Sequence, residues 1–248
     1  MKLHIIGSSS KGNAYALEGR KEILLIEAGC RIALVNQAIN WQIGKVVGCV
    51  ISHEHEDHIG RAKEYSGLGF PIYAPPEAAK KAWEDRWMEI HTVECVDGVP
   101  VESIRLGEFL ISPFDVPHDG TQCFGYEIQH PELGNLVFLT DFQYCPYIFR
   151  QHNLHHILVE ANYSRDCLNL DQPNVQHVVE GHAELSTAVG FIRENATDNL
   201  RNVVLLHLSD SNSNEKDFVE AVQKVVPAGV SVHVATPGKT IHLYKDVF

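Results

Sequence analysis

The sequence contains no apolar run that approaches the roughly 20 residues of a membrane-spanning helix. Its first residues, MKLHIIG, become polar too early for a secretory signal peptide. The six cysteines are scattered and form no CxxC pair, which indicates buried, reduced thiols. These absences predict a cytoplasmic protein that has no membrane partner.

Basic residues are also scarce, with 20 Lys and Arg against 32 Asp and Glu and a net charge of −12. This balance argues against a broad basic surface for nucleic acid. It does not exclude a nucleic-acid enzyme, because bound divalent cations would bring positive charge to the place where a phosphate binds. Histidine is abundant, with 15 residues, so a histidine is informative only through its context.

The 248 residues, 44% of them apolar, are expected to form one domain, 1–248, with a substantial core. Short strands are predicted at 3–6, 14–17, 22–26, 46–52 and 71–74, and helices at 32–39, 59–65 and 75–88. Strands dominate from 90 to 139; beyond 153, strands at 157–160, 203–207 and 230–235 alternate with helices at 185–192 and 215–225. Trp83 and Trp87 share a helix face, which favours core packing or a lid over base stacking. This order fits an α/β protein with an αββα four-layer sandwich.

The densest group of metal-binding side chains is the stretch HEHEDH at 53–58, directly after a predicted strand. While the chain remains extended, His53, His55 and Asp57 project to the same side, and His58 adds a second direction. One metal ion needs three or four such ligands. Four of them so close together, aimed in two directions, indicate a pair of metal ions rather than a polar, solvated loop.

His118, Asp141 and His207 each follow an apolar strand run directly. Imidazoles and a carboxylate suit zinc, manganese or iron, and no cysteine accompanies them. With the stretch 53–58 they complete a set: three histidines for one metal, Asp57, His58 and His207 for another, and Asp141 between. Two cations about 3.5–4 Å apart can hold a bridging hydroxide as nucleophile and bind a phosphoryl or carbonyl oxygen. No serine or cysteine nucleophile is then needed.

These residues carry a resemblance to a known family. HEHEDH resembles the HxHxDH signature of the metallo-β-lactamase superfamily, and His118, Asp141 and His207 stand at its expected later positions. Within the superfamily, GSSSKGN at 7–13 and HLSDSN at 207–212 resemble segments of the YycJ-like (WalJ) branch. The matches together cover most of the chain.

The resemblance implies an αββα fold that holds two metal ions. It places His53, His55 and His118 on the first metal, Asp57, His58 and His207 on the second, and Asp141 as a bridge. The branch is associated with metal-dependent DNA exonuclease activity, so the resemblance implies DNA or another phosphodiester as substrate.

Two more segments, VEANY at 159–163 and EGH at 180–182, are similar to nuclease branches that include tRNase Z, where a Glu and His pair serves the leaving group. A carboxylate beside a histidine keeps the imidazole protonated and ready to donate. The similarity implies Glu160 as the orienting residue and His182 as the general acid, alongside Asp57 as a catalytic metal ligand. The other interpretation of His182 is an ordinary histidine at a helix start near a glycine turn.

Small polar residues complete the predicted site as phosphate contacts or as supports of the metal ligands. They are Ser8, Ser9, Ser10, Asn13, Asn162, Ser209 and Asn212. The loop 7–13 would let backbone N–H groups approach an anion. A flexible hairpin loop explains its composition equally well.

The sequence departs from the family pattern in two places. Glu27 stands where the superfamily usually has aspartate, and its extra methylene is expected to shift a hydrogen bond to a metal-bound histidine. The spacing from His182 to Ser186 is two residues longer than in the branch, which bears on where His182 lies. The chain is also too short to include the large inserted cap of the RNA-cleaving β-CASP enzymes.

We therefore predict a dinuclear hydrolase with Zn²⁺ or Mn²⁺ that acts on DNA as an exonuclease-like phosphodiesterase. One alternative is a hydrolase of the same fold that cleaves a small cyclic phosphodiester, a lactone or a thioester, which the negative charge favours. Another is an iron redox protein, against which His55 argues because diiron relatives carry a carboxylate there. A non-enzymatic interaction role is a further alternative. The sequence leaves the oligomeric state open.

Overall fold

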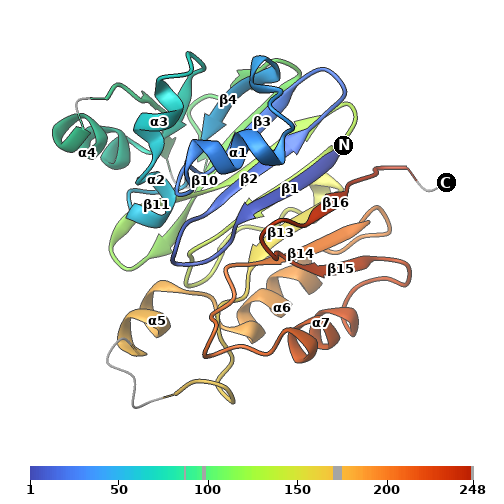
Figure 1. Ribbon diagram of the computed structural model, residues 1–248. Helices are drawn as coiled ribbons and strands as arrows, with labels where there is room; N and C mark the ends of the chain where they lie inside the picture. The colour runs from blue at the N-terminus through green and yellow to red at the C-terminus, as the bar shows by residue number, and fades with distance from the viewer. Residues whose placement is uncertain (87, 97–98, 170–174, 247–248) are drawn as a thin grey trace.

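The computed structural model describes residues 1–86, 88–96, 99–169 and 175–246, which form two mixed β-sheets packed face to face (Figure 1). The first sheet has the order β16 (Thr240–His242), β1 (Lys2–Gly7), β2 (Ala14–Glu18), β3 (Ile23–Ile26), β4 (Val46–Val50), β5 (Ile72–Ala74) and β6 (His91–Thr92). The second has the order β15 (Ser231–Val234), β14 (Asn202–Leu206), β13 (His156–Glu160), β12 (Gly134–Leu139), β11 (Thr121–His130), β10 (Phe109–His118) and β9 (Ile104–Leu106). A small ribbon pairs β7 (Cys95–Val96) with β8 (Val99–Pro100).

Helices cover the outer faces of both sheets. The first sheet carries α1 (Ile32–Ala38), α2 (Glu56–Ile59), α3 (Ala62–Ser66) and α4 (Pro76–Arg86), and the second carries α6 (Leu185–Asn195) and α7 (Glu215–Gln223). The chain also forms α5 (Val175–Gly181) and the short 3₁₀ helices η1 (Ile43–Lys45) and η2 (Arg150–His152). None of the described helices is long and apolar enough to cross a membrane.

Three apolar layers hold the four structural layers together. Between the sheets, side chains from both inner faces interdigitate, and Tyr15 meets Phe138 edge to face with ring centroids 5.5 Å apart. Val35 and Tyr65 pack from helices onto the first sheet, whereas Phe218 packs onto the second. The expected αββα sandwich is confirmed.

The sequence prediction of one helix over 59–65 is wrong, because two short helices stand there. Gly60 N still donates to Glu56 O at 2.9 Å, but Arg61 N donates to Ala28 O at 2.9 Å, outside the helix. This tertiary hydrogen bond ends α2 and starts a new helix. Because α2 already begins at Glu56, Asp57 lies in a helical turn and not in extended chain, so it does not project in line with His53 and His55 as expected.

Three other expectations differ from the structure. Trp83 on α4 is 55% exposed, so of the expected roles, core packing or a lid, core packing is wrong for this residue; Trp87 lies outside the described residues. The helix α5 and the strand β16 were not predicted. Of the six cysteines, all free, Cys49 and Cys123 are buried, and the other four are only partly so.

His156 begins β13 and is fully buried between β12 and β14 of the second sheet. Its Nε2–H donates to Leu133 O at 3.1 Å, and its Nδ1 accepts from Asn202 Nδ2 at 3.1 Å. The two bonds require the neutral ring. Burial lowers the pKa of His156 to about 3, assisted by the neighbouring His155.

Acid should therefore destabilise the fold through His156. Above about pH 6.5 the ring is neutral in both states; below it, only the unfolded chain takes up the proton, so stability falls until the folded pKa is reached. Between pH 7 and 5 the wild type should lose about 2 kcal/mol more unfolding free energy than His156→Gln, which keeps a donor and an acceptor. Urea unfolding of both proteins at pH 7 and pH 5 measures this difference. An equal loss of unfolding free energy in the wild type and in His156→Gln would contradict the prediction.

Candidate metal centre

The predicted ligands meet because they follow strands whose ends lie at one edge of the sandwich. The strands β3 to β6 run parallel, as do β12 to β15, and β4, β12 and β14 each end just before a ligand. Asp141 and His207 come within two residues of β12 and β14, His53 follows β4, and His118 closes β10. Carboxyl ends of parallel strands share an edge, which places these side chains together.

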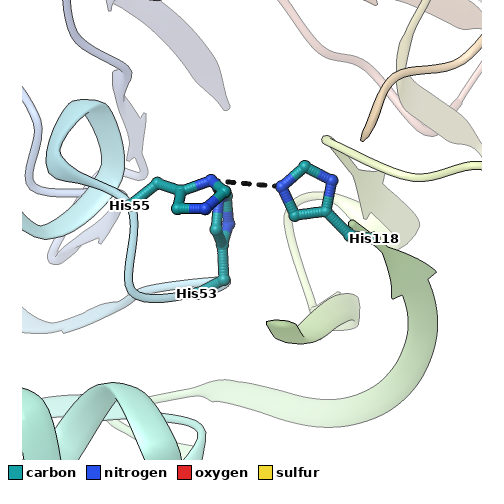
Figure 2. A group of neighbouring side chains, drawn as sticks. All are labelled: His53, His55 and His118. Atoms are coloured by element: carbon teal, nitrogen blue, oxygen red, sulfur yellow. Dashed lines mark hydrogen bonds between the residues drawn. The ribbon is translucent and has the colours of Figure 1, made fainter. Parts of the chain in front are cut away.

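Three histidines form the first group of ligands (Figure 2). His55 Nδ1 lies 3.0 Å from His53 Nε2 and 3.2 Å from His118 Nε2, so three ring nitrogens from two segments converge. The opposite nitrogens have partners of their own. His118 Nδ1–H donates to Gly181 O at 2.6 Å, and His53 Nδ1 is hydrogen-bonded to Ser52 Oγ at 2.8 Å.

These outer partners leave lone pairs for a cation. Because Gly181 O can only accept, His118 carries its proton on Nδ1, and its Nε2 lone pair faces the other two rings. Burial, and after it the neighbouring imidazoles, lowers the pKa of His53 well below its ordinary value. Neutral, oriented imidazoles of this kind suit zinc or a similar divalent ion.

The second group has Asp57, His58, Asp141 and His207, whose ligand atoms lie within 4.8 Å of one another. His58 Nε2 is 3.3 Å from Asp57 Oδ2 and 3.4 Å from Asp141 Oδ2. His207 Nε2 is buried, lies 3.5 Å from Asp57 Oδ2 and has no hydrogen-bond partner among the described residues. A buried polar atom left unsatisfied costs about 1–3 kcal/mol. A divalent cation would satisfy this nitrogen, so the donor set fits a metal.

Further side chains support the second group from behind. Asn13 Nδ2 donates to Asp57 Oδ2 at 3.1 Å, and Ser8 Oγ accepts from the backbone N–H of His207 at 2.9 Å. Both residues are buried and contact this group directly. Asn162 likewise donates to His207 O at 2.8 Å.

Several residues in or next to the two ligand groups have strained backbone angles. Glu27, Asp119, Asp141 and His207 have positive φ angles of 66°, 30°, 47° and 51°. Non-glycine residues in this region cost of the order of 1–3 kcal/mol each, and they persist where the surrounding structure fixes them, often at functional sites. The site is thus held in its geometry against local preference.

Glu160 and His182 form a pair beside the second group. His182 Nδ1–H donates to Glu160 Oε1 at 2.7 Å, and His207 Nδ1–H donates to the same oxygen at 3.0 Å. Ala183 N donates to Glu160 Oε2 at 3.0 Å, which fixes the carboxylate. Burial alone would lower the pKa of His182, but the adjacent Glu160 carboxylate raises it above its ordinary value. The longer spacing before Ser186 therefore does not remove His182 from the site.

The remaining predicted contacts line a pocket of about 240 Å³ next to His182 and His207. They are Ser9, Ser10, Asn162, Ser209 and Asn212. The roles of all these residues remain predictions, although the structure brings them together.

Sequence reasoning missed several supporting groups. Ser52 and Thr140 stand directly before His53 and Asp141, and Thr140 Oγ1 donates to Asp141 Oδ1 at 2.7 Å. A hydroxyl residue just before a strand-end ligand was the available signal. No sequence signal indicated that the Gly181 carbonyl would contact His118, because this carbonyl comes from the end of α5, a helix that the sequence pattern did not predict.

This fold and this gathering of histidines and carboxylates define a metal-dependent hydrolase of the metallo-β-lactamase fold. The model of the β-lactamase superfamily domain matches residues 24–208, and the chain belongs to this family. The superfamily membership that the HEHEDH stretch indicated is confirmed.

Among curated relatives, the chain is similar to exodeoxyribonuclease YycJ of Bacillus anthracis, with 26% identity over 94% of this chain and 92% of the relative. Exodeoxyribonuclease WalJ of Streptococcus pneumoniae strain D39 is 24% identical over 94% and 91%. The solved metallo-β-lactamase fold protein YhfI of Bacillus subtilis superposes with a TM-score of 0.69 at 19% identity, over 97% of this chain and 98% of that chain. The resemblance to the YycJ-like branch is confirmed.

Glu27 stands where the superfamily usually has aspartate, and its side chain, one methylene longer, still contacts His58. Its Oε1 lies 3.4 Å from His58 Nδ1, and the backbone N–H of Ser52 lies 3.3 Å from both of its carboxylate oxygens. A carboxylate behind a metal-bound histidine orients the ring and raises its basicity.

Glu27→Gln should therefore weaken metal affinity about 10- to 100-fold, because the amide keeps the shape but loses the charge. Competition with a chromophoric chelator measures the affinity. Glu18→Gln is the matched control, because Glu18 also pairs with a buried imidazole, His4 Nε2 at 2.5 Å, and belongs to none of the candidate metal-binding groups. Equal affinity in Glu27→Gln and the wild type would contradict the role of Glu27.

Proposed function

We propose that the protein is a phosphodiesterase that hydrolyses DNA from an end, with two divalent cations, Zn²⁺ or Mn²⁺, in the metal centre. The observation that carries the proposal is the Glu160–His182 pair, which stands 2.7 Å apart beside the second ligand group. A departing sugar alkoxide needs a proton, whereas many other leaving groups of hydrolases do not. The names of the two exodeoxyribonuclease relatives support the same substrate class.

The ligand residues have separate tasks in this proposal. His53, His55 and His118 would hold one cation, and Asp57, His58, Asp141 and His207 the other. The family resemblance implies that Asp141 would serve both. Such cations supply a hydroxide nucleophile at neutral pH and stabilise the negative charge on phosphoryl oxygens.

His182 would donate the proton that the leaving group needs, and Glu160 would hold His182 in place for this transfer. Nδ1–H of His182 is engaged by Glu160, so Nε2–H is the atom that donates to the leaving oxygen as its bond to phosphorus breaks. Glu160 is buried and fixed by Ala183 N, and it stabilises the charged imidazolium before the transfer. The carboxylate thus favours the protonated form of His182, because it raises the pKa of that imidazole.

The acidic charge of −12 favours a second candidate, a small cyclic phosphodiester as substrate. A small substrate would need no basic track along the surface. The same metal centre and the same proton donor would serve it.

Replacing one ligand tests the metal centre and separates the two candidates. Protein stripped by a chelator and reloaded with Mn²⁺ or Zn²⁺ should release mononucleotides from linear duplex DNA. Asp57→Asn should lower this rate by on the order of 10²-fold or more, since even outer partners of metal ligands contribute 10–100-fold. Asp217→Asn, on the exposed face of α7, is the control. Intact DNA together with cleavage of a cyclic dinucleotide would favour the small substrate.

Removing the proton donor should affect only leaving groups that need a proton. His182→Gln should lower kcat for DNA about 10²- to 10⁴-fold. Hydrolysis of bis(p-nitrophenyl) phosphate should change little, because p-nitrophenolate is stable without protonation. His130→Gln, which alters a buried histidine far from the ligands, controls for stability. Equal losses on both substrates would show that His182 has only a structural role.

A further inference from the structure

A groove of about 700 Å³ lies between two strands at the edges of the sheets, and its lining includes none of the predicted metal ligands. One side is formed by β15, an outermost strand of the second sheet, and the other by β16, an outermost strand of the first (Figure 1). Asn202, which begins β14, also lines the groove, whereas the ligand His207 follows the opposite end of this strand. Five residues of extended chain span about 16 Å, so the groove is separate from the metal centre.

The groove contains two basic residues, Arg201 and Lys239, that form no ion pair with a described residue. Asp198 and Asp246 line it as well. The pKa of His155, whose backbone oxygen accepts from Arg201 N at 2.8 Å, reports on the charge at one end. Burial lowers this pKa most, and Arg201 lowers it further, by more than Asp246 raises it. Positive charge therefore outweighs Asp246 beside Arg201.

The guanidinium of Arg201 has an unused hydrogen-bonding edge. Its Nη1 donates to Asp198 O at 2.6 Å and to Leu200 O at 3.1 Å. Its Nε is buried and has no partner among the described residues, and the same is true of His207 Nε2 in the metal centre. A buried donor left unsatisfied is unfavourable. Because Nε and Nη2 form the edge on which arginine binds an oxyanion through two parallel hydrogen bonds, this edge points to a phosphate or a carboxylate.

Lys239 is close enough to contact the same anion. Its Nζ donates to Val234 O at 3.4 Å, a long hydrogen bond, whereas Ser231 at the start of β15 donates its N–H to Arg201 O at 2.9 Å. The three residues from Ser231 to Val234 span about 10 Å. The flexible four-carbon side chain of lysine can cover much of this distance, so one phosphate can be bound by both basic groups.

Two aromatic rings add a flat surface to this groove. The rings of His242 and Tyr244 are nearly parallel, with an angle of 9° between them and centroids 5.7 Å apart. Tyr244 OH lies 3.1 Å from His242 Nδ1, which fixes the two rings relative to each other. Both side chains are exposed. Exposed aromatic side chains of this kind bind nucleobases by stacking, whereas a bare phosphate needs no such surface.

We propose that this groove binds a nucleoside monophosphate, with the phosphate on Arg201 and Lys239 and the base on the rings of His242 and Tyr244. Its volume of about 700 Å³ lies within the roughly 300–1,000 Å³ of common small-molecule sites and is too large for a phosphate alone. The inference does not rest on the proposed function, although nucleotides are also the products that this function would release.

Calorimetric titration of chelator-treated protein with 2′-deoxyadenosine 5′-monophosphate tests the proposal, because the chelator removes metal ions that would bind phosphate elsewhere. One equivalent of the nucleotide should bind, about tenfold more tightly than inorganic phosphate, since stacking adds to the phosphate contacts. Lys239→Met should weaken nucleotide binding about tenfold, the effect of one charge-assisted contact. Arg201→Lys, which keeps the charge but loses the two-donor edge, should weaken it similarly. Tyr244→Ala should weaken binding of the nucleotide but not of phosphate.

Lys216→Met is the control, because Lys216 is an exposed lysine on α7 that pairs with Glu220 outside the groove. Absence of nucleotide binding, or binding that persists in both Lys239→Met and Arg201→Lys, would overturn the proposal. Equal affinity for the nucleotide and for phosphate, or an unchanged nucleotide affinity in Tyr244→Ala, would overturn the assignment of a nucleotide. Because the readout is binding without metal, failure of the proposed DNA hydrolysis would leave this test unaffected.

Discussion

The structure depends on burying carboxylates and imidazoles together at one edge of the sandwich. Burial raises the pKa of Asp141, but His207 and His58 outweigh burial and hold it well below its usual value. Burial would lower the pKa of His207, yet Asp141 and its neighbours raise it to about 10. Each charge is tolerated because the opposite charge lies within about 4 Å. A divalent cation in this place would displace protons from the imidazoles, so its binding is linked to pH.

The topology explains why these charges can be gathered at all. His53 and His207 leave parallel strands of different sheets, so side chains from opposite halves of the chain reach one edge. The backbone there adopts left-handed angles at Asp141 and His207, which turn the chain out of each strand at once and point the side chain across the edge. The extensive core between the sheets stabilises the strands enough to hold these unfavourable turns.

Sequence reasoning predicted the ligands better than their supports. Apolar strand runs and the HEHEDH stretch indicated His53 and His207 as candidate ligands, because a side chain that directly follows a buried strand has a fixed place in such folds. The break between α2 and α3 was missed because Arg61 N bonds to the distant Ala28 O, a contact that no local pattern contains. Ser8 and Asn13 were predicted as phosphate contacts or as supports of the ligands, and the long-range hydrogen bonds that bury them are likewise absent from any local pattern. Local signals give the order of elements, and tertiary hydrogen bonds decide which polar residues face the solvent.

The acidic surface and the proposed substrate are compatible when binding is confined to one end of a strand. With a net charge of −12, the protein gains little from long contacts along a DNA backbone, whose affinity comes from many Lys and Arg residues. Positive charge would come instead from divalent cations held by the histidines and carboxylates of the metal centre. A strand end can bring a phosphate to this one place without laying the duplex against the acidic protein. Contacts confined to the strand end therefore suit the charge of this chain better than a long track along the DNA backbone would.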